Sequence, residues 1–156
     1  MKKTNAERLL EAAKIKFEAI EYKVDENDLS GDHIARELGI DPDMMFKTLV
    51  LKGEKNGHAV CCIPTSAELD LKKVAQAAGE KKIEMIAEKQ LLPTTGYIRG
   101  GCSPVGMKKK FPTFFDESAT LFEEIYVSAG VRGVTLKIKA TDLISYVEGK
   151  VYDLTK

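Results

Sequence analysis

Cysteine is scarce in this chain of 156 residues, which contains Cys61, Cys62 and Cys102. An odd number of cysteines argues against a disulfide framework. Free thiols suit a reducing compartment, so we expect a cytoplasmic protein. Cys61 and Cys62 are adjacent, and neighbouring side chains of a strand point to opposite faces. They cannot share one metal ion, and without a CxxC motif the sequence predicts no metal site.

Long apolar runs and an excess of either charge are also absent. The apolar stretches are short, such as 125–127, so no segment is expected to span a bilayer. Residues 1–14 lack the apolar core of a signal peptide and have the pattern of an amphipathic helix. Lys+Arg and Asp+Glu both number 24, so any nucleic-acid contact must come from local clustering. The length predicts a single domain over 1–156.

The spacing of apolar residues predicts short strands mixed with short helices. A capping box at Thr4 and Glu7 begins a predicted helix over 4–19. Residues 46–52 and 58–64 have the composition of two strands joined by a hairpin turn. The other predicted helices lie near 34–38, over 70–78, before Pro93 and over 142–147; the other strands are 20–24, 82–86, 97–99, 113–116, 124–128, 134–139 and 151–154. Because hairpins dominate, we expect an α/β fold of α+β character, built on a mixed, mainly antiparallel sheet.

The stretch from Thr95 to Phe111 has an unusual composition, with four glycines, a Ser-Pro pair and three consecutive lysines. Gly101 and Gly106 have the spacing of a P-loop, but Met107 occupies the position of its lysine. A P-loop is therefore not expected. Two interpretations stay open: a loop whose backbone amides bind an anion or a carbonyl, and a tight connection that needs glycine only for its geometry.

Lys47 lies in a strand between apolar neighbours. It either extends its ammonium group to water or faces a pocket, where it would act as a tuned base or an anion clamp. Cys102 is a weaker candidate, because a nucleophilic thiol needs a base and only His33 and His58 are available. A buried, chemically inert cysteine is the favoured interpretation.

The segment from Ser128 to Gly133 is a second glycine-rich turn, with a hairpin connection as its simplest interpretation. It also supplies a hydroxyl group, free amides and the guanidinium of Arg132. If the two loops lie at one end of the sheet, Lys108, Lys109, Lys110 and Arg132 would form one basic patch that suits an RNA backbone. A charged run of this kind is also typical of a solvated face.

Three groups of residues together resemble the YbaK/EbsC-type aminoacyl-tRNA deacylases, which are free-standing relatives of the editing domain of bacterial prolyl-tRNA synthetases. They are 46–50 (FKTLV), 95–97 with 100–109 (TGY and GGCSPVGMKK), and 125–130 (IYVSAG) with Arg132 and Gly133. The resemblance covers nearly the whole chain in one order. It implies a barrel-like sheet surrounded by helices.

The resemblance also implies an activity, which is removal of cysteine from misacylated Cys-tRNA(Pro), and by extension from Cys-tRNA(Cys), without a metal or organic cofactor. Lys47 would hold the 3′-terminal adenosine region, and the substrate's own thiol would attack its ester. The partner would be aminoacylated tRNA, with prolyl-tRNA synthetase as a further partner. The implied substrate-binding residues are Tyr22, Thr48, Gly100, Gly101, Ser103, Pro104, Ser128 and Gly130, and the tRNA-binding residues are Lys108, Lys109, Lys110 and Arg132.

Two departures from the family pattern leave the amino acid open: Cys102 stands where relatives carry Ile, and Ala129 where they carry Gly. The alternatives are a deacylase for another amino acid, such as alanine on tRNA(Pro), and a module that binds a nucleotide or an RNA end without catalysis. The oligomeric state stays open, and no anchor or signal supports a cell-envelope role.

Overall fold

A long antiparallel hairpin lies at the centre of the computed structural model, which describes residues 2–156. Strand β2 (Phe46–Gly53) pairs with β3 (Gly57–Pro64) over its whole length, with Lys47 opposite Ile63. This confirms the predicted hairpin. The Glu80 carboxylate accepts hydrogen bonds from the amides of Lys55 and Asn56, at 2.9 and 2.6 Å, which ties the hairpin turn to the segment after α3.

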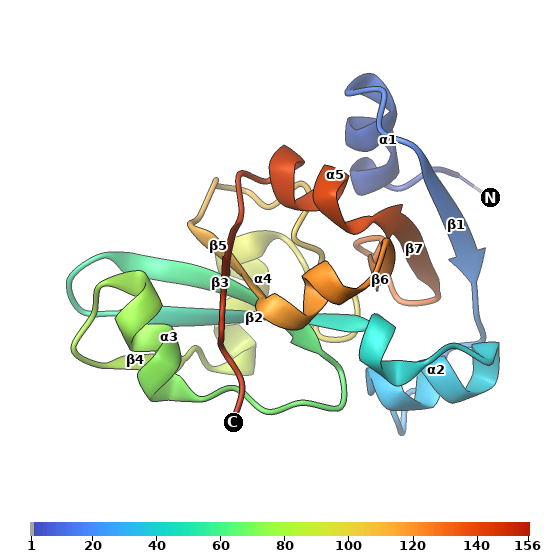
Figure 1. Ribbon diagram of the computed structural model, residues 1–156. Helices are drawn as coiled ribbons and strands as arrows, with labels where there is room; N and C mark the ends of the chain where they lie inside the picture. Colours follow the sequence, from blue (N-terminus) through green and yellow to red (C-terminus); the bar gives the residue numbers. More distant parts are fainter. Residues whose placement is uncertain (1) are drawn as a thin grey trace.

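Helices cover the strands on several sides (Figure 1). The helices are α1 (Asn5–Ala12), α2 (Gly31–Leu38), α3 (Leu71–Ala78), α4 (Glu88–Thr95) and α5 (Ala140–Tyr146), with 3₁₀ turns at Pro42–Met44 and Glu117–Leu121. The remaining strands are β1 (Phe17–Glu21), β4 (Ile83–Met85), β5 (Thr113–Asp116), β6 (Glu124–Ser128), β7 (Val134–Lys139) and β8 (Lys150–Tyr152). The alternation of apolar residues predicted for 134–139 is confirmed, since Val134, Leu136 and Ile138 are all buried.

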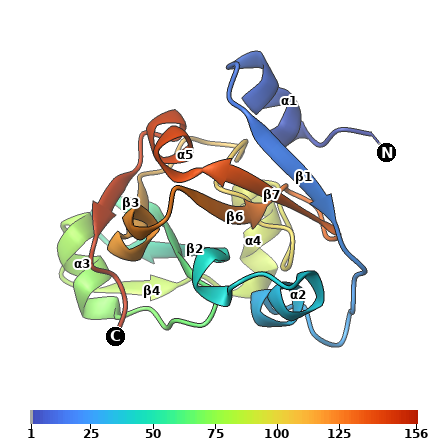
Figure 2. The same cartoon turned by 45° about the vertical axis from the view of Figure 1, so that its right-hand side comes forward.

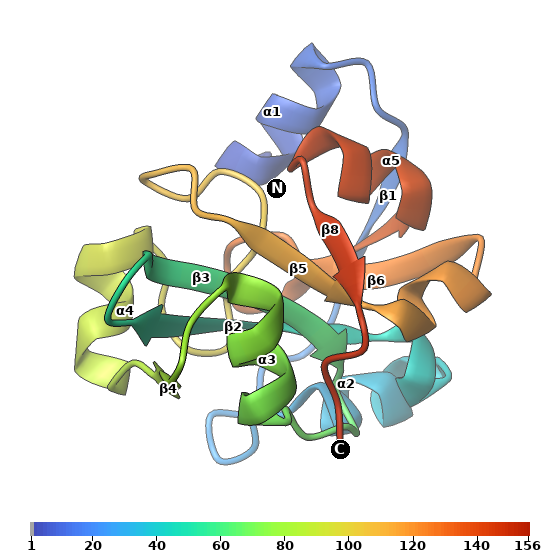
Figure 3. The same cartoon turned by 60° about the vertical axis from the view of Figure 1, so that its left-hand side comes forward.

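The strands form two sheets. The five-stranded sheet has the order β4-β2-β3-β5-β8, in which β5 is parallel to both of its neighbours. The three-stranded sheet has the order β1-β7-β6 and is wholly antiparallel. Figure 2 shows the smaller sheet and Figure 3 shows β8 beside β5. The prediction of a mixed, mainly antiparallel sheet with surrounding helices is therefore confirmed.

The prediction of a barrel-like sheet was wrong in one respect, because the sheets do not close into a barrel. Among residues 2–156, one isolated bridge joins Met45, the residue just before β2, to Tyr126 of β6. The strands β4, β8 and β1 remain sheet edges. Closure needs ladder hydrogen bonds at every strand boundary, and here side-chain packing replaces them where the two sheets meet.

The main hydrophobic core lies between the two sheets. Phe46, Val50 and Cys62 of the larger sheet pack with Val127 and Leu136 of the smaller one. The opposite face of β2 and β3 forms a second core beneath α3, which includes Cys61. Cys61 and Cys62 thus face different cores, as strand geometry predicts.

The first helix is shorter than the predicted 4–19. The capping box at Thr4 and Glu7 is present, but α1 ends at Ala12 because Lys14 adopts a left-handed conformation with φ 60°. The amide of Ile15 donates to the Leu10 carbonyl, and that of Lys14 to Glu11, which is a Schellman ending. Glycine normally marks this position, so a lysine there gave no signal. The following strand consequently occupies 17–21 rather than 20–24.

Two further predictions near the glycine-rich loop were wrong. Helix α4 does not stop before Pro93 but contains it and continues to Thr95, where Gly96 ends the helix with φ 87°. Residues 97–99 form no strand; they begin an irregular loop that runs to β5. Pro93 lies in the last turn of this short helix and has no N–H to donate to the Lys89 carbonyl, so α4 continues to Thr95 without that hydrogen bond.

Leu10 tests whether α1 is an integral part of the core. Its side chain is fully buried in the main core, so Leu10→Ala should lower the free energy of unfolding by about 2–5 kcal/mol. Leu121→Ala is the matched control, because Leu121 is 78% exposed, and it should change stability by less than about 0.5 kcal/mol. Urea denaturation measures both values. Similar small losses in the two variants would contradict the packing described for α1.

Candidate functional site

A cavity of about 340 Å³ opens where the two sheets diverge. Its wall is formed by the loop between β1 and α2 with the start of α2, the first residues of β2, the residue after β3, the loop after α4, and the adjoining ends of β6 and β7. The lining residues are Tyr22, Asn27–Gly31, Ile34, Met45–Leu49, Thr65, Arg99, Gly100, Cys102, Ser128, Val134 and Thr135. Its volume is in the range of small-molecule sites, which begins at about 300 Å³.

Strand β2 contributes Lys47 and Thr48 to the cavity wall. Both residues are half-buried, and both border the cavity. The cavity lies at the beginning of the strand. The Thr48 hydroxyl is 3.8 Å from the Cys62 sulfur, on the side of the main core. Of the two interpretations of Lys47, the structure thus favours the pocket-facing one.

The two glycine-rich segments meet beside the cavity, as one of the sequence hypotheses required. The Arg132 Nε donates a hydrogen bond of 2.8 Å to the Arg99 carbonyl. At Gly101, an added Cβ would lie 3.1 Å from the backbone of Val131. Close approach of the two backbones therefore requires glycine here. Gly100 and Ser128 consequently border the same cavity.

The buried Tyr97 side chain contacts both glycine-rich segments. Its hydroxyl donates a hydrogen bond to the Val105 carbonyl, and its ring packs against Gly130. An added Cβ on Gly130 would lie 2.8 Å from the Tyr97 Cε1 atom. Burial raises the pKa of the Tyr97 hydroxyl to about 12, so it remains a hydrogen-bond donor at neutral pH.

Several of the predicted pocket residues lie behind the cavity wall rather than in it. Ser103 is fully buried, and its Oγ accepts a hydrogen bond of 3.2 Å from the Val105 amide. Gly101, Pro104 and Gly130 likewise do not border the cavity. Their contacts shape the loops that form the wall, and direct roles in substrate binding stay predictions.

The predicted basic patch is more dispersed than its sequence suggests. Lys110 forms an ion pair of 2.5 Å with Glu148, just after α5. The Lys108 side chain lies against Gly96, and none of Lys108, Lys109 or Lys110 borders the cavity. Their contact with RNA stays a prediction.

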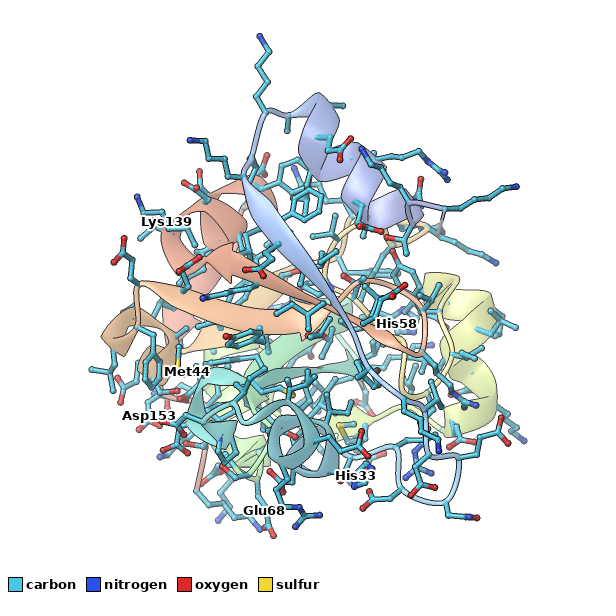
Figure 4. All side chains as sticks on the ribbon, turned by 90° about the vertical axis from the view of Figure 1, so that its right-hand side faces the viewer. His33, Met44, His58, Glu68, Lys139 and Asp153 are labelled. Carbon is cyan, nitrogen blue, oxygen red and sulfur yellow. The ribbon has the colours of Figure 1, made fainter. Side chains whose placement is uncertain are left out.

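Cys102 borders the cavity but has the properties of a neutral thiol. Burial raises its pKa to about 12, well above that of a reactive cysteine. Neither His33 nor His58 borders the cavity; both are labelled in Figure 4. His58 instead packs on the Phe111 ring, 5.3 Å between ring centres. The cavity therefore contains no thiol–imidazole pair for nucleophilic catalysis.

The P-loop interpretation of Gly101 to Gly106 is excluded by the local structure. A P-loop joins a strand to the start of a helix, whereas this segment follows the α4 helix and leads into the strand β5. Within residues 2–156, no group of three or more His, Cys, Asp or Glu side chains is arranged to hold a metal ion. None of the helices in the same range combines the length and apolar character of a membrane span.

Sequence reasoning missed the loop between β1 and α2, although it supplies Asn27 to Gly31 to the cavity. Its polar composition indicated only a turn. Gly31 belongs to this part of the site because of a close contact: an added Cβ would lie 2.2 Å from the Thr65 Oγ1. That contact joins α2 to the end of β3, and no local pattern could reveal it. Arg99 was also missed as a cavity residue.

Comparison with known proteins assigns this fold and cavity to a class. The aminoacyl-tRNA editing domain family matches residues 30–146, and the chain belongs to that family. A curated protein of Enterococcus faecalis (strain ATCC 700802 / V583), named as a candidate Cys-tRNA(Pro)/Cys-tRNA(Cys) deacylase, EbsC, is 46% identical over 153 residues. The match covers 98% of this chain and 93% of that protein.

Solved structures share the same fold. One is described as a candidate trans-editing enzyme for prolyl tRNA synthetase; it has a TM-score of 0.81 and 22% identity, and the match covers 97% of this chain and 96% of that one. Another, of a protein described only as hypothetical, has a TM-score of 0.88 and 19% identity, with 96% and 98% covered. The family resemblance found in the sequence is confirmed by the family match and by the E. faecalis relative.

Gly130 tests the contact between Tyr97 and the second glycine-rich turn. Gly130→Ala adds a clash with the ring to the strain of a φ of 96°. Gly39→Ala is the matched control, since Gly39 has φ 68° and open space around its Cα. We expect the control to cost about 1–2 kcal/mol of unfolding free energy and Gly130→Ala about 1–3 kcal/mol more. Equal losses in urea denaturation would contradict the described packing of Tyr97.

Proposed function

We propose that this protein is a trans-editing aminoacyl-tRNA deacylase that removes cysteine from misacylated Cys-tRNA(Pro), and also from Cys-tRNA(Cys). The observation that carries the proposal is the position of Lys47 in the wall of a cavity that contains no thiol–imidazole pair. Membership of the aminoacyl-tRNA editing family and the 46% identity to the E. faecalis protein support it.

The proposed reaction uses the best nucleophile available, which belongs to the substrate. The cysteine thiol attacks the carbonyl of its own ester, so that a new S–C bond forms and the C–O bond to the ribose breaks. The thiol proton passes to the ribose oxygen, and a cyclic thiolactone leaves. The protein has to hold thiol and ester in a reactive geometry and stabilise the developing negative charge.

Lys47 is the side chain best suited to that electrostatic role. Lys47 is half-buried at the start of β2 and borders the cavity, where reduced exposure to water strengthens the attraction of its charge for an anion. It would hold the 3′-terminal adenosine and its phosphate beside the cavity. Thr48, Gly100 and Ser128 border the same space and would contact the aminoacyl group, and Tyr22 would close one side.

The partner in this proposal is the acceptor end of an aminoacylated tRNA. The reaction needs no metal or organic cofactor, since the substrate supplies the nucleophile. Prolyl-tRNA synthetase, the source of the misacylated tRNA, would be a docking partner. With these partners the protein would act in the cytoplasm. Lys108 to Lys110 and Arg132 would contact the RNA backbone outside the cavity.

A matched pair of lysine variants on one strand tests the proposal. Lys47→Ala should lower the rate of cysteine release from Cys-tRNA(Pro) by about 100-fold or more, the size expected for loss of an electrostatic stabiliser. Lys52→Ala should retain the activity, because Lys52 is an exposed residue of the same strand outside the cavity. Ester loss is followed with radiolabelled cysteine under single-turnover conditions.

Three results would contradict the proposal in different ways. Equal activity of the two variants would remove Lys47 from the mechanism. Release of alanine from Ala-tRNA(Pro), without release of cysteine from Cys-tRNA(Pro), would show that the protein acts on another amino acid. Binding of tRNA without release from either species would indicate a module that binds the RNA end without catalysis.

A further inference from the structure

Arg99 is a cavity residue for which the proposed function has given no role. It lies in the loop after α4 and borders the same cavity as Lys47. Unlike Lys47, its side chain is largely exposed, at 70%. Its guanidinium is therefore at the solvent side of the cavity, where an RNA strand would enter.

The backbone that carries Arg99 is fixed by its neighbours. The Arg99 carbonyl accepts the 2.8 Å hydrogen bond from the Arg132 Nε, and the amide of Gly101 donates to the Ile98 carbonyl at 3.0 Å. Gly100 has φ 86°, and an added Cβ there would lie 3.2 Å from the same Nε atom. A long side chain on an anchored backbone can change its contact without moving the cavity wall.

The Arg99 guanidinium contacts Glu88, the first residue of α4, with 3.2 Å between Nη1 and Oε1. Both side chains are exposed, at 70% and 66%, and exposed ion pairs contribute little to stability. The contact with Glu88 uses one guanidinium nitrogen, whereas a phosphate can accept two parallel hydrogen bonds from the same guanidinium. An incoming RNA strand can therefore replace Glu88 as the partner of Arg99.

The charges around the cavity are consistent with an anionic ligand. Its charged lining residues are Lys47, Arg99 and Asp28. One oxygen of the Asp28 carboxylate, Oδ1, accepts hydrogen bonds from the Ser30 amide at 3.1 Å and from the Ser30 hydroxyl at 2.6 Å. The two cations are the charged lining groups that suit an anionic ligand. In an aminoacyl-tRNA the ester end itself has no anionic group, so phosphates are the groups that two cations would bind.

We propose that Arg99 binds a backbone phosphate of the tRNA acceptor end, and that Glu88 holds the guanidinium in the free protein and releases it when RNA binds. This inference rests on the proposed function and adds a second anchoring point to Lys47. Arg99 positions the RNA strand and does not contact the reacting ester, so it should affect binding and not the chemical step.

The test combines binding and kinetics for four variants: Arg99→Gln, Glu88→Gln, the double variant, and Lys89→Gln as a control. Lys89 is an exposed lysine of α4 that does not border the cavity. Binding of uncharged tRNA(Pro) is measured by filter binding across a series of NaCl concentrations, and release of cysteine from Cys-tRNA(Pro) is measured in parallel.

Arg99→Gln should raise KM about five- to tenfold with kcat within twofold of the wild type, and the slope of log affinity against log salt should fall by about 0.7–1. Lys89→Gln should leave KM and the slope near wild type. Glu88→Gln should tighten tRNA binding two- to fivefold at low salt. That gain should disappear in the double variant, because it acts through Arg99.

Two outcomes would overturn the inference: equal effects of Arg99→Gln and Lys89→Gln, or a Glu88→Gln gain that persists without Arg99 and so reflects only the removal of a negative charge. The proposed function fails separately. A wild-type protein that releases no amino acid, yet loses tRNA affinity through Arg99→Gln in the predicted manner, would contradict the deacylase and support the Arg99 contact.

Discussion

The structure depends on the packing of the two sheets against each other. Phe46, Val50 and Cys62 from one sheet and Val127 and Leu136 from the other form a continuous buried core. Only one isolated bridge, at Met45 and Tyr126, joins the sheets by backbone hydrogen bonds within residues 2–156. Hydrophobic burial therefore holds them together, and the cavity lies where that packing ends. In a closed barrel, hydrogen bonds between neighbouring strands would join the two sheets at this point.

The chemistry proposed for the cavity follows from which groups are near it. Cys102 is a neutral thiol with a pKa of about 12, and neither histidine reaches the site. What the chain offers is a cation on a rigid strand, Lys47, and a wall of backbone held by Tyr97 and Arg132. Such a site can orient a reactive substrate and stabilise charge. It is poorly suited to generating its own nucleophile, which agrees with a substrate that carries a thiol.

Elements with strong local signals could be predicted from the sequence. The hairpin of β2 and β3 and the capping box at Thr4 follow from alternation and capping chemistry, whereas alternation left open whether Lys47 faces water or a pocket. The end of α1 could not be predicted, because Lys14 adopts a conformation that usually marks glycine. Only some of the residues that line the cavity could be predicted from the sequence. Lys47 and the glycine-rich loop lie within recognisable patterns, whereas Asn27 to Gly31 and Arg99 join the site through contacts between distant segments.

The central claim is that this protein acts on an ester through the substrate's own thiol. Its most direct test compares the release of the amino acid from Cys-tRNA(Pro) and from the same tRNA carrying S-methylcysteine, whose sulfur cannot supply a thiolate. We predict rapid loss of the cysteinyl ester with a thiolactone as the first product, and loss of the S-methyl ester at the uncatalysed rate. Equal enzyme-catalysed rates for the two substrates would contradict the account.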